Sequence, residues 1–188
     1  MAERKNLPVD ILTIMYTDMV RSTAIADFLR GEHGNDTGDN IYAERVRGPH
    51  DAIVRLWLAV YNGYEVKTIG DSFMAVFKQP NDAIRAATCI IIDLADSNIK
   101  NPADHDRPLQ LRIGFHLGIV RPEEVDGIVK DYSGHNVNLA ARVESLAVGS
   151  QILFSGAVKE IVDSLPGFEF HSWGKRKLKG IKGPVEIL

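Results

Sequence analysis

The segment EVKTIGDSFMAVF, residues 65–77, constrains the fold most strongly, because it predicts a β-hairpin. Two runs rich in apolar and β-branched residues flank the two-residue turn Gly70-Asp71, an inversion of the Asp-Gly pair that is common in such turns. Strands joined in this way are antiparallel neighbours in one sheet. The hairpin also places Lys67 and Asp71 four residues apart among apolar neighbours, a pairing of cation and carboxylate that suggests a functional role.

Hydrophobic periodicity predicts the other strands and helices. Strands are expected at residues 11–18, 109–120, 128–132, 151–155, 168–173 and 184–188. Helices are expected at residues 21–30, 42–61, 80–96, 136–146 and 156–165. Loops or turns are expected at residues 31–40, 97–108, 121–127 and 174–183. The resulting order, βααββαββαβαββ, predicts an α+β fold in which helices cover one face of a mostly antiparallel sheet.

Composition indicates one cytoplasmic domain. The 188 residues suit a single hydrophobic core, so we predict a polar tail at residues 1–8 and one domain at residues 9–188. The net charge of −3 offers no general attraction for nucleic acid or anionic lipid. The single cysteine, Cys89, cannot form an internal disulfide, and its apolar neighbours predict a buried structural thiol. We expect no membrane segment, because no apolar run approaches the ~18 residues that span a bilayer.

Two aspartates are candidate metal ligands. Asp18 stands where an apolar strand ends, and Asp71 stands at the tip of the hairpin. If the two strands are neighbours in one sheet, the carboxylates converge on one edge, where paired carboxylates can hold Mg²⁺ together with phosphate oxygens. Each aspartate alone is equally compatible with an ordinary turn residue.

The turn after Asp18 is a candidate phosphate site. Val20, Arg21, Ser22 and Thr23 offer successive backbone N–H groups at the start of a predicted helix, and such groups bind phosphate together with the helix dipole. The alternative is an ordinary helix start, with Ser22 or Thr23 near the cap.

A second set of polar residues lies in the C-terminal half. Asn138 and Arg142 are four residues apart and share one face of a predicted helix, where they could stabilise charge on a transferring phosphoryl group. A simple exposed pair is the alternative. The segment GKRKLKGIKG carries five cations and could contact phosphate, or it could be a solvated basic loop.

Taken in order, five motifs resemble the class III nucleotidyl cyclase catalytic domain. The motifs are YTDM, KTIGDSFMAVF, RIGFHLG, DYSGHNVNLAARVES and LKGIKGPVEI, and the resemblance extends over residues 9–188. It implies the nucleotidyl cyclase fold, which has a ferredoxin-like βαββαβ core and a mostly antiparallel sheet covered by helices.

The resemblance also implies roles for the metal and phosphate ligands. Asp18 and Asp71 are similar to the two metal-binding aspartates, which would hold two Mg²⁺ or Mn²⁺ ions in each active site. The backbone carbonyl of Met19 would complete one of the metal sites. Lys179 aligns with a lysine that contacts the terminal phosphates.

Four further residues match positions that bind the nucleoside. Lys67 and Asp131 resemble the pair that reads the purine edge. A lysine donor and an aspartate acceptor complement adenine, whose N1 accepts and whose N6 amine donates a hydrogen bond. Asn138 and Arg142 match the residues that orient the ribose and stabilise the transition state.

The activity implied by the resemblance is that of an adenylate cyclase. Attack of the ribose 3′-hydroxyl on the α-phosphate of ATP would give 3′,5′-cyclic AMP and pyrophosphate. Relatives act as head-to-tail dimers, so a homodimer would have two composite sites with the aspartates and the nucleoside-binding residues on different protomers. The alternatives are a guanylate or dual-purine cyclase and a non-catalytic nucleotide-binding or dimerisation module. Relatives are commonly joined to regulatory domains, of which the sequence shows none.

Three residues depart from the family pattern or stand apart from it. Arg21 occupies a position where many relatives carry a small residue, and its side chain could crowd or assist the phosphate turn. His135 is either a surface histidine or a pH-sensitive contact at the dimer interface. His116, within RIGFHLG, is expected to be buried and structural.

Overall fold

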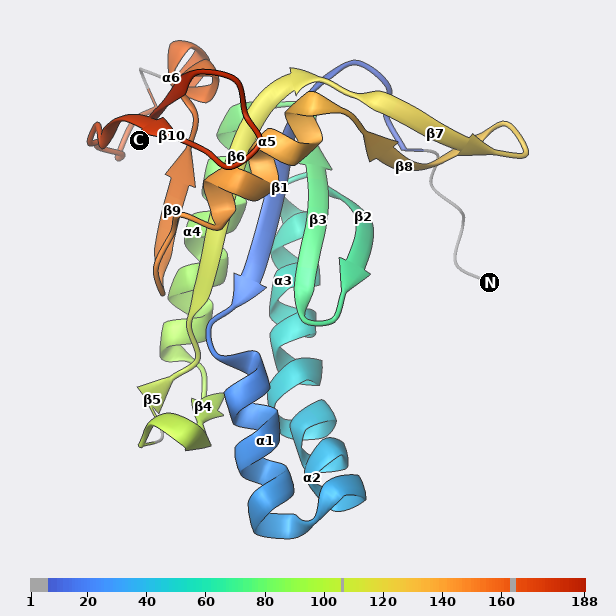
Figure 1. Cartoon of the computed structure of the whole chain (residues 1–188), viewed down its shortest axis with the longest axis vertical. Coiled ribbons are helices and arrows are strands. Elements are labelled where there is room, and N and C mark those ends of the chain that lie inside the picture. Colours follow the sequence, from blue (N-terminus) through green and yellow to red (C-terminus); the bar gives the residue numbers. More distant parts are fainter. Residues whose placement is uncertain (1–6, 106, 163–164) are drawn as a thin grey trace.

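A five-stranded sheet organises the molecule (Figure 1). The computed structural model describes residues 7–105, 107–162 and 165–188 of the 188-residue chain. The helices are α1 (Ser22–His33), α2 (Asn35–Tyr42), a π-helical turn η1 (Ala43–Arg47), α3 (Gly48–Val60), α4 (Pro80–Asp96), a 3₁₀ turn η2 (Pro102–Asp104), α5 (His135–Glu144) and α6 (Gly156–Val162). The strands are β1 (Ile11–Met19), β2 (Tyr64–Ile69), β3 (Ser72–Phe77), β4 (Lys100–Asn101), β5 (Arg107–Pro108), β6 (Leu111–Ile119), β7 (Arg121–Val125), β8 (Ile128–Ser133), β9 (Gln151–Phe154), β10 (Gly174–Lys177) and β11 (Pro184–Ile187).

The sheet has the strand order β2-β3-β1-β6-β9. Strand β1 is antiparallel to both β3 and β6, and β9 is parallel to β6, which confirms a mostly antiparallel sheet. The predicted hairpin is also confirmed, with β2 and β3 joined through Gly70, whose positive φ of 66° is favoured by glycine. This order places the end of β1 beside the hairpin turn.

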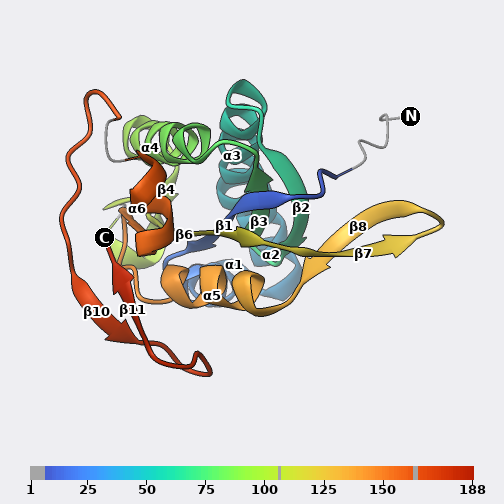
Figure 2. The same ribbon diagram turned by 90° about the horizontal axis from the view of Figure 1, so that it is seen from above.

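Helices cover both faces of the sheet (Figure 2). Alternate residues of β1 face opposite ways, so Met15 and Met19 pack with α3 and α4, while Leu12 and Ile14 pack with α5. Our expectation that helices cover one face only was therefore wrong in this detail. The helix that carries Asn138 and Arg142 lies on the face opposite α3 and α4.

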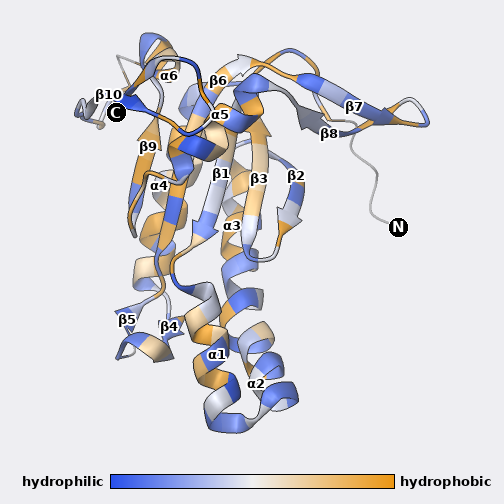
Figure 3. Ribbon diagram, in the orientation of Figure 1, coloured by the Kyte–Doolittle hydropathy of each residue, from blue (hydrophilic) through white to orange (hydrophobic). Residues whose placement is uncertain are grey.

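Two hairpins extend from the sheet. Strands β7 and β8 form an arm that projects from the body, and Figure 3 shows that β7 is largely hydrophilic. Strands β10 and β11 form a second hairpin near the C-terminus. We predicted a loop at residues 121–127 and a basic turn at 174–183, so β7 and β10 correct both assignments. The predicted strand at 168–173 is absent from the described structure, where β10 begins at Gly174 and pairs with β11.

The segment 31–40 is helical rather than a loop. Helix α1 runs to His33, and α2 begins at Asn35 although the segment is rich in Gly, Asn and Asp. Gly38 explains this difference, because a Cβ at this position would meet the backbone N of Arg30 at 2.6 Å. Arg30 also bridges Asp27 and Asp39 across the two helices, at 2.9 and 2.7 Å. Close packing of α2 on α1 thus overrides the local preference for a loop.

Smaller differences concern the ends of elements and the central loop. The helix expected at 42–61 is divided by the π-helical turn η1, and the loop expected at 97–108 contains β4, η2 and β5. Residues 1–6 of the predicted tail and residues 163–164 of the predicted helix lie outside the described residues. Within the described part of the chain, no helix combines the length and apolar character needed to cross a membrane.

Two side chains that we expected to be structural can be placed. His116 is buried, and its ring contacts Ser155 Oγ at 2.7 Å and Asn136 Oδ1 at 3.1 Å, which confirms the prediction. Burial lowers the pKa of His116 below its usual value. Cys89 is half-buried rather than buried, and its sulfur lies 3.7 Å from the Tyr61 hydroxyl.

Candidate active site

The end of β1 and the β2–β3 turn form a carboxylate edge. The Ser72 hydroxyl donates a hydrogen bond to Asp18 Oδ1 at 2.7 Å, and the backbone N–H of Met19 donates to Asp71 Oδ2 at 3.2 Å. These contacts follow from the register of β1 and β3, in which Thr17 lies opposite Phe73. The structure therefore brings together Asp18, Met19 and Asp71, the three residues predicted at the metal site.

The donor atoms at this edge suit a hard divalent cation. Carboxylate oxygens are the ligands that Mg²⁺ prefers, usually one or two per ion together with phosphate oxygens. Among residues 7–105, 107–162 and 165–188, no cluster of three or more His, Cys, Asp or Glu side chains could hold a metal by itself. Two carboxylates without a complete protein cage fit an ion whose remaining ligands come from a phosphate-bearing substrate.

Sequence analysis missed two charged residues at this edge. Arg112 lies directly opposite Asp18 in the pairing of β6 with β1, and its guanidinium forms an ion pair with Asp18 Oδ2. Arg112 Nε also lies 3.3 Å from Oε1 of Glu144, which comes from α5. A charged residue between Leu111 and Ile113 was the available signal, because a charge inside an apolar strand requires a partner.

Burial and charge change the pKa values of this group. Burial lowers the pKa of Arg112, but the carboxylates of Asp18, Glu144 and Asp71 outweigh that effect and raise it above its usual value. Burial raises the pKa of Glu144 to about 7, with the Arg112 charge opposing the rise and the Asp18 charge adding to it. The edge therefore holds several mutually dependent charges at low solvent exposure.

The predicted phosphate turn has an unusual backbone. Arg21 adopts a left-handed conformation with φ 62° and ψ 27° at the start of α1, and its guanidinium lies 4.0 Å from the Asp104 carboxylate. The N–H of Val20 donates to the Gln110 carbonyl at 2.9 Å, so this amide is already bonded and is not a free phosphate donor. The N-cap residue of α1 is Arg21, so Ser22 lies next to the cap as the alternative expected, but no side chain caps the helix with a hydrogen bond.

Lys67 and Asp131 meet within one chain. Lys67 Nζ donates to Asp131 Oδ2 at 2.5 Å, and the backbone N–H of Tyr132 donates to Asp131 Oδ1 at 2.7 Å. A β-bulge between Glu65 and Lys67 makes this contact possible. Without the bulge, Glu65 and Lys67 would face the same side of the sheet. With it, Glu65 lies opposite Ala75 and Lys67 lies opposite Met74, and these adjacent residues of β3 face opposite sides. Lys67 is thereby turned toward the β7–β8 arm.

The remaining predicted residues are exposed and separate. Asn138 and Arg142 share the exposed face of α5, whereas Val137, Leu139, Ala140 and Val143 are buried. Lys179 is exposed in the turn between β10 and β11, and His135 is exposed at the start of α5. In the described part of the chain, no hydrogen bond or ion pair joins Asn138, Arg142 or Lys179 to the carboxylate edge.

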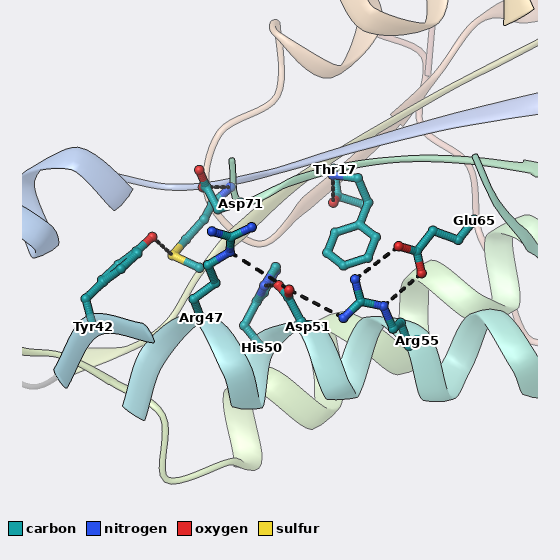
Figure 4. A network of polar contacts seen from close by, with 10 residues as sticks. Thr17, Tyr42, Arg47, His50, Asp51, Arg55, Glu65 and Asp71 are labelled. Carbon is teal, nitrogen blue, oxygen red and sulfur yellow. Dashed lines mark hydrogen bonds and ion pairs between the residues drawn. The ribbon is translucent and has the colours of Figure 1, made fainter. Parts of the chain in front are cut away.

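The end of α2 supports the edge from the face of the sheet that packs on α3 and α4 (Figure 4). The Tyr42 hydroxyl lies 3.7 Å from the sulfur of Met19. Burial raises the pKa of Tyr42 to about 12, and the nearby charge of Asp71 adds to this rise. Tyr42 therefore remains a neutral hydrogen-bonding group beside the carboxylates.

A polar network continues along α3 to β2 (Figure 4). His50, which is fully buried, contacts Asp51 Oδ1 at 2.9 Å, and Asp51 Oδ2 lies 3.5 Å from Arg55. Arg55 donates two hydrogen bonds to Glu65 of β2, at 2.8 and 3.0 Å, and its guanidinium stacks over the Phe73 ring at 5.1 Å. The network fixes the base of the hairpin against α3.

The fold and the carboxylate edge define a class III nucleotidyl cyclase catalytic domain. The sequence model of the adenylate and guanylate cyclase catalytic domain family matches residues 5–187, so the chain belongs to this family. It is 28% identical over 228 residues to the receptor-type adenylate cyclase GRESAG 4.1 of Trypanosoma brucei brucei, which covers 99% of this chain and 18% of the relative. It is 29% identical over 130 residues to putative adenylate cyclase 3 of Rhizobium meliloti, which covers 69% of this chain and 21% of the relative. The chain thus spans about a fifth of the length of these relatives.

Solved structures show the same fold. An adenylate cyclase from Trypanosoma brucei in its monomeric state superposes with a TM-score of 0.74 at 27% identity, covering 98% of this chain and 92% of that one. The guanylyl cyclase Cya2 superposes with a TM-score of 0.72 at 25% identity, covering 97% of this chain and 92% of that one. The neighbours include cyclases of both purine classes, so the likeness supports a cyclase without deciding the base.

Proposed function

We propose that this domain is an adenylate cyclase, which converts ATP to 3′,5′-cyclic AMP and pyrophosphate at composite sites of a head-to-tail homodimer. The observation that carries the choice of base is the 2.5 Å contact between Lys67 and Asp131. The names of relatives that are called adenylate cyclases add support to this choice.

The polarity of the Lys67–Asp131 pair favours adenine. An ammonium group has three donors, and one of them is used by Asp131, so two are free for an acceptor such as adenine N1. The Asp131 carboxylate has lone pairs left for the N6 amine after it accepts from Lys67 and Tyr132. Guanine presents an acceptor and a donor in the opposite arrangement, so its N1–H donor would face the Lys67 donor and its O6 acceptor would face the Asp131 acceptor.

The carboxylate edge is proposed to hold two Mg²⁺ or Mn²⁺ ions through Asp18, Asp71 and the carbonyl of Met19. When bound, such ions make the ribose 3′-hydroxyl more acidic and neutralise the phosphates. In this proposal, Asn138 orients the ribose and Arg142 neutralises charge on the phosphoryl oxygens. Lys179 and the amides of Arg21, Ser22 and Thr23 bind the terminal phosphates.

The separation of the candidate residues supports a composite site. Asn138 and Arg142 project from the exposed face of α5, whereas Asp18 and Asp71 lie where the end of β1 meets the β2–β3 turn. A second copy of the chain, related by a two-fold axis, can present its α5 to this edge and receive the same contribution in return. The protruding β7–β8 arm, which carries Asp131, is available for the same interface.

Cyclisation of ATP and GTP by the purified protein tests the base. With Mg²⁺ or Mn²⁺ supplied, we expect ATP to be preferred in kcat/KM by about 100-fold, because the wrong base leaves the Lys67–Asp131 pair without partners. Replacing Lys67 with Glu and Asp131 with Ser should lower or reverse that preference. A wild-type preference for GTP would overturn the base assignment, and a failure to form either cyclic product would favour the non-catalytic alternative.

Mixing two inactive variants tests the composite site. Asp71→Asn removes one carboxylate of the edge, and Arg142→Ala removes the proposed transition-state contact from α5. In a composite dimer, a heterodimer of the two variants has one intact site, so random mixing restores about a quarter of wild-type activity. If all catalytic groups of a site come from one chain, the mixture stays as inactive as its components.

A further inference from the structure

The carboxylate edge contains a guanidinium where a metal ion would bind. Arg112 forms an ion pair with Asp18 Oδ2, and the other Asp18 oxygen accepts the Ser72 hydroxyl at 2.7 Å. Both oxygens of Asp18 are therefore occupied by groups of the protein itself. A divalent cation needs at least one of these oxygens at close range, and it repels a guanidinium at the same place.

The same guanidinium has a second carboxylate beside it. Arg112 Nε and Glu144 Oε1 lie 3.3 Å apart, and among the described residues these two buried atoms form no hydrogen bond. The Glu144 side chain is only 12% exposed, compared with 25% for Asp18. A small rotation of Arg112 away from Asp18 would convert the Glu144 contact into a hydrogen-bonded ion pair, so the arginine would not be left without a partner.

The backbone fixes Glu144 in this position. A Cβ on Gly114 of β6 would meet the backbone N of Glu144 at 2.1 Å, so the end of α5 lies directly on the strand that carries Arg112. The two carboxylates that share Arg112 therefore come from rigid elements, β1 and α5. Only the arginine side chain has to move between them.

We propose that Arg112 is a built-in counter-ion of the metal-free site, which competes with the divalent cation for Asp18 and is held by Glu144 when the cation binds. This inference rests on the proposed metal site at Asp18 and Asp71. In the absence of a cation, Arg112 offsets the repulsion between the carboxylates of the edge. The affinity for a cation is then set by the balance between the two partners of Arg112.

The competition predicts opposite effects on Mn²⁺ affinity for the replacement of Arg112 and the replacement of Glu144. Removing the competing charge with Arg112→Gln should tighten binding of Mn²⁺ alone by about tenfold, because the fraction of protein with a free Asp18 rises. Removing the alternative partner with Glu144→Gln should weaken Mn²⁺ binding about threefold or more, because Arg112 is then harder to displace. A merely structural role for the two residues would weaken binding in both variants.

Titration with Mn²⁺ in the absence of nucleotide, followed by the electron paramagnetic resonance signal of the free ion, measures these affinities. Arg47→Gln is the matched control, since the charge of Arg47 also acts on Tyr42 beside this edge, but Arg47 forms its ion pair with Asp51, at 4.0 Å. Its removal changes the field without freeing Asp18, and we expect a change below about threefold. Equal changes for Arg112→Gln and Arg47→Gln, or tighter binding by Glu144→Gln, would overturn the inference.

A second titration separates this inference from the proposed function. Mn²⁺ binding in the presence of a non-reactive ATP analogue should depend on Asp18 and Asp71 in the wild-type protein. If Mn²⁺ binding depends on these aspartates, and Arg112→Gln leaves the nucleotide-free affinity unchanged, the competition is refuted while the metal site stands. If Mn²⁺ binding does not depend on them, both the metal site and the inference are refuted. Should Arg112→Gln fail to fold, Glu144→Gln is compared with Arg47→Gln. Weaker Mn²⁺ binding by Glu144→Gln than by Arg47→Gln supports the inference, and equal or tighter binding refutes it.

Discussion

Replacing Gly114 with alanine tests the contact that positions helix α5. A Cβ on Gly114 would meet the backbone N of Glu144 at 2.1 Å and its Cα at 2.3 Å. Because both are backbone atoms, no side-chain rotation relieves the overlap. The end of α5 must therefore recede by about 1.3 Å to reach an ordinary contact distance of 3.4 Å.

The expected cost follows from this displacement. Overpacking in a core costs up to about 3 kcal/mol, and alanine recovers up to about 1 kcal/mol by restricting the unfolded chain. We expect Gly114→Ala to lower the free energy of unfolding by about 2 kcal/mol, which a domain of ordinary stability survives. Helix α5 also carries Asn138 and Arg142, and a misplacement of about 1 Å at a catalytic group can lower kcat by about 10²-fold.

Urea unfolding and cyclase assays at one fixed protein concentration measure the two effects. Gly31→Ala in α1 is the control, because a Cβ there meets nothing within 4 Å. Alanine should stabilise this helix by up to about 1 kcal/mol. Equal stability of the two variants would refute the close packing of α5 on β6. A destabilised Gly114→Ala protein with kcat within threefold of wild type would refute the catalytic role given to α5.

Three further predictions concern groups outside the site. Burial lowers the pKa of His116, so the imidazole binds more protons in the unfolded chain than in the folded one at pH values below its ordinary pKa of 6.5. The free energy of unfolding should therefore fall as pH decreases through 6.5, and it should fall less in His116→Gln. Urea unfolding at pH 7.5 and 5.5 measures this difference. Trp57→Phe removes the 2.7 Å hydrogen bond from the indole to Asp93 and should cost about 1 kcal/mol of unfolding free energy. Arg55→Lys exchanges the two-hydrogen-bond contact with Glu65 for a point charge and should lower the unfolding free energy by about 0.5–1 kcal/mol, an effect that high salt reduces.

The elements that sequence analysis predicted correctly are those whose signals all lie within the element itself. The β2–β3 hairpin needs only its turn and two apolar runs, and α4 needs only its proline start and its apolar face. The convergence of Asp18 and Asp71 could be predicted because both stand at strand ends. These features require no knowledge of what packs on them.

The elements that it missed depend on distant partners. The segment at 168–173 alternates like a strand, but its rings pack on β9 instead, with Phe168 and Phe170 stacked and Phe170 5.3 Å from the Phe154 ring. An alternating pattern indicates only that every second side chain is buried. An extended segment whose aromatic rings pack on the core has the same pattern without pairing to another strand. The same reasoning covers α2, whose glycine is explained only by the backbone of α1 against it.

The placement of Lys67 shows why a correct residue can be predicted without its geometry. In a regular strand, residues two apart face the same side, so Glu65 and Lys67 together would have predicted one shared environment. The bulge between them sends Glu65 to Arg55 of α3 and Lys67 to Asp131 of β8, on opposite faces of the sheet. A bulge leaves no trace in composition or periodicity over six residues, because it adds one residue to one strand only. The purine-reading pair proposed here therefore depends on a register shift in the pairing of β2 with β3. Asp71 lies beyond both strands, in the turn, where the N–H of Met19 donates a hydrogen bond to it.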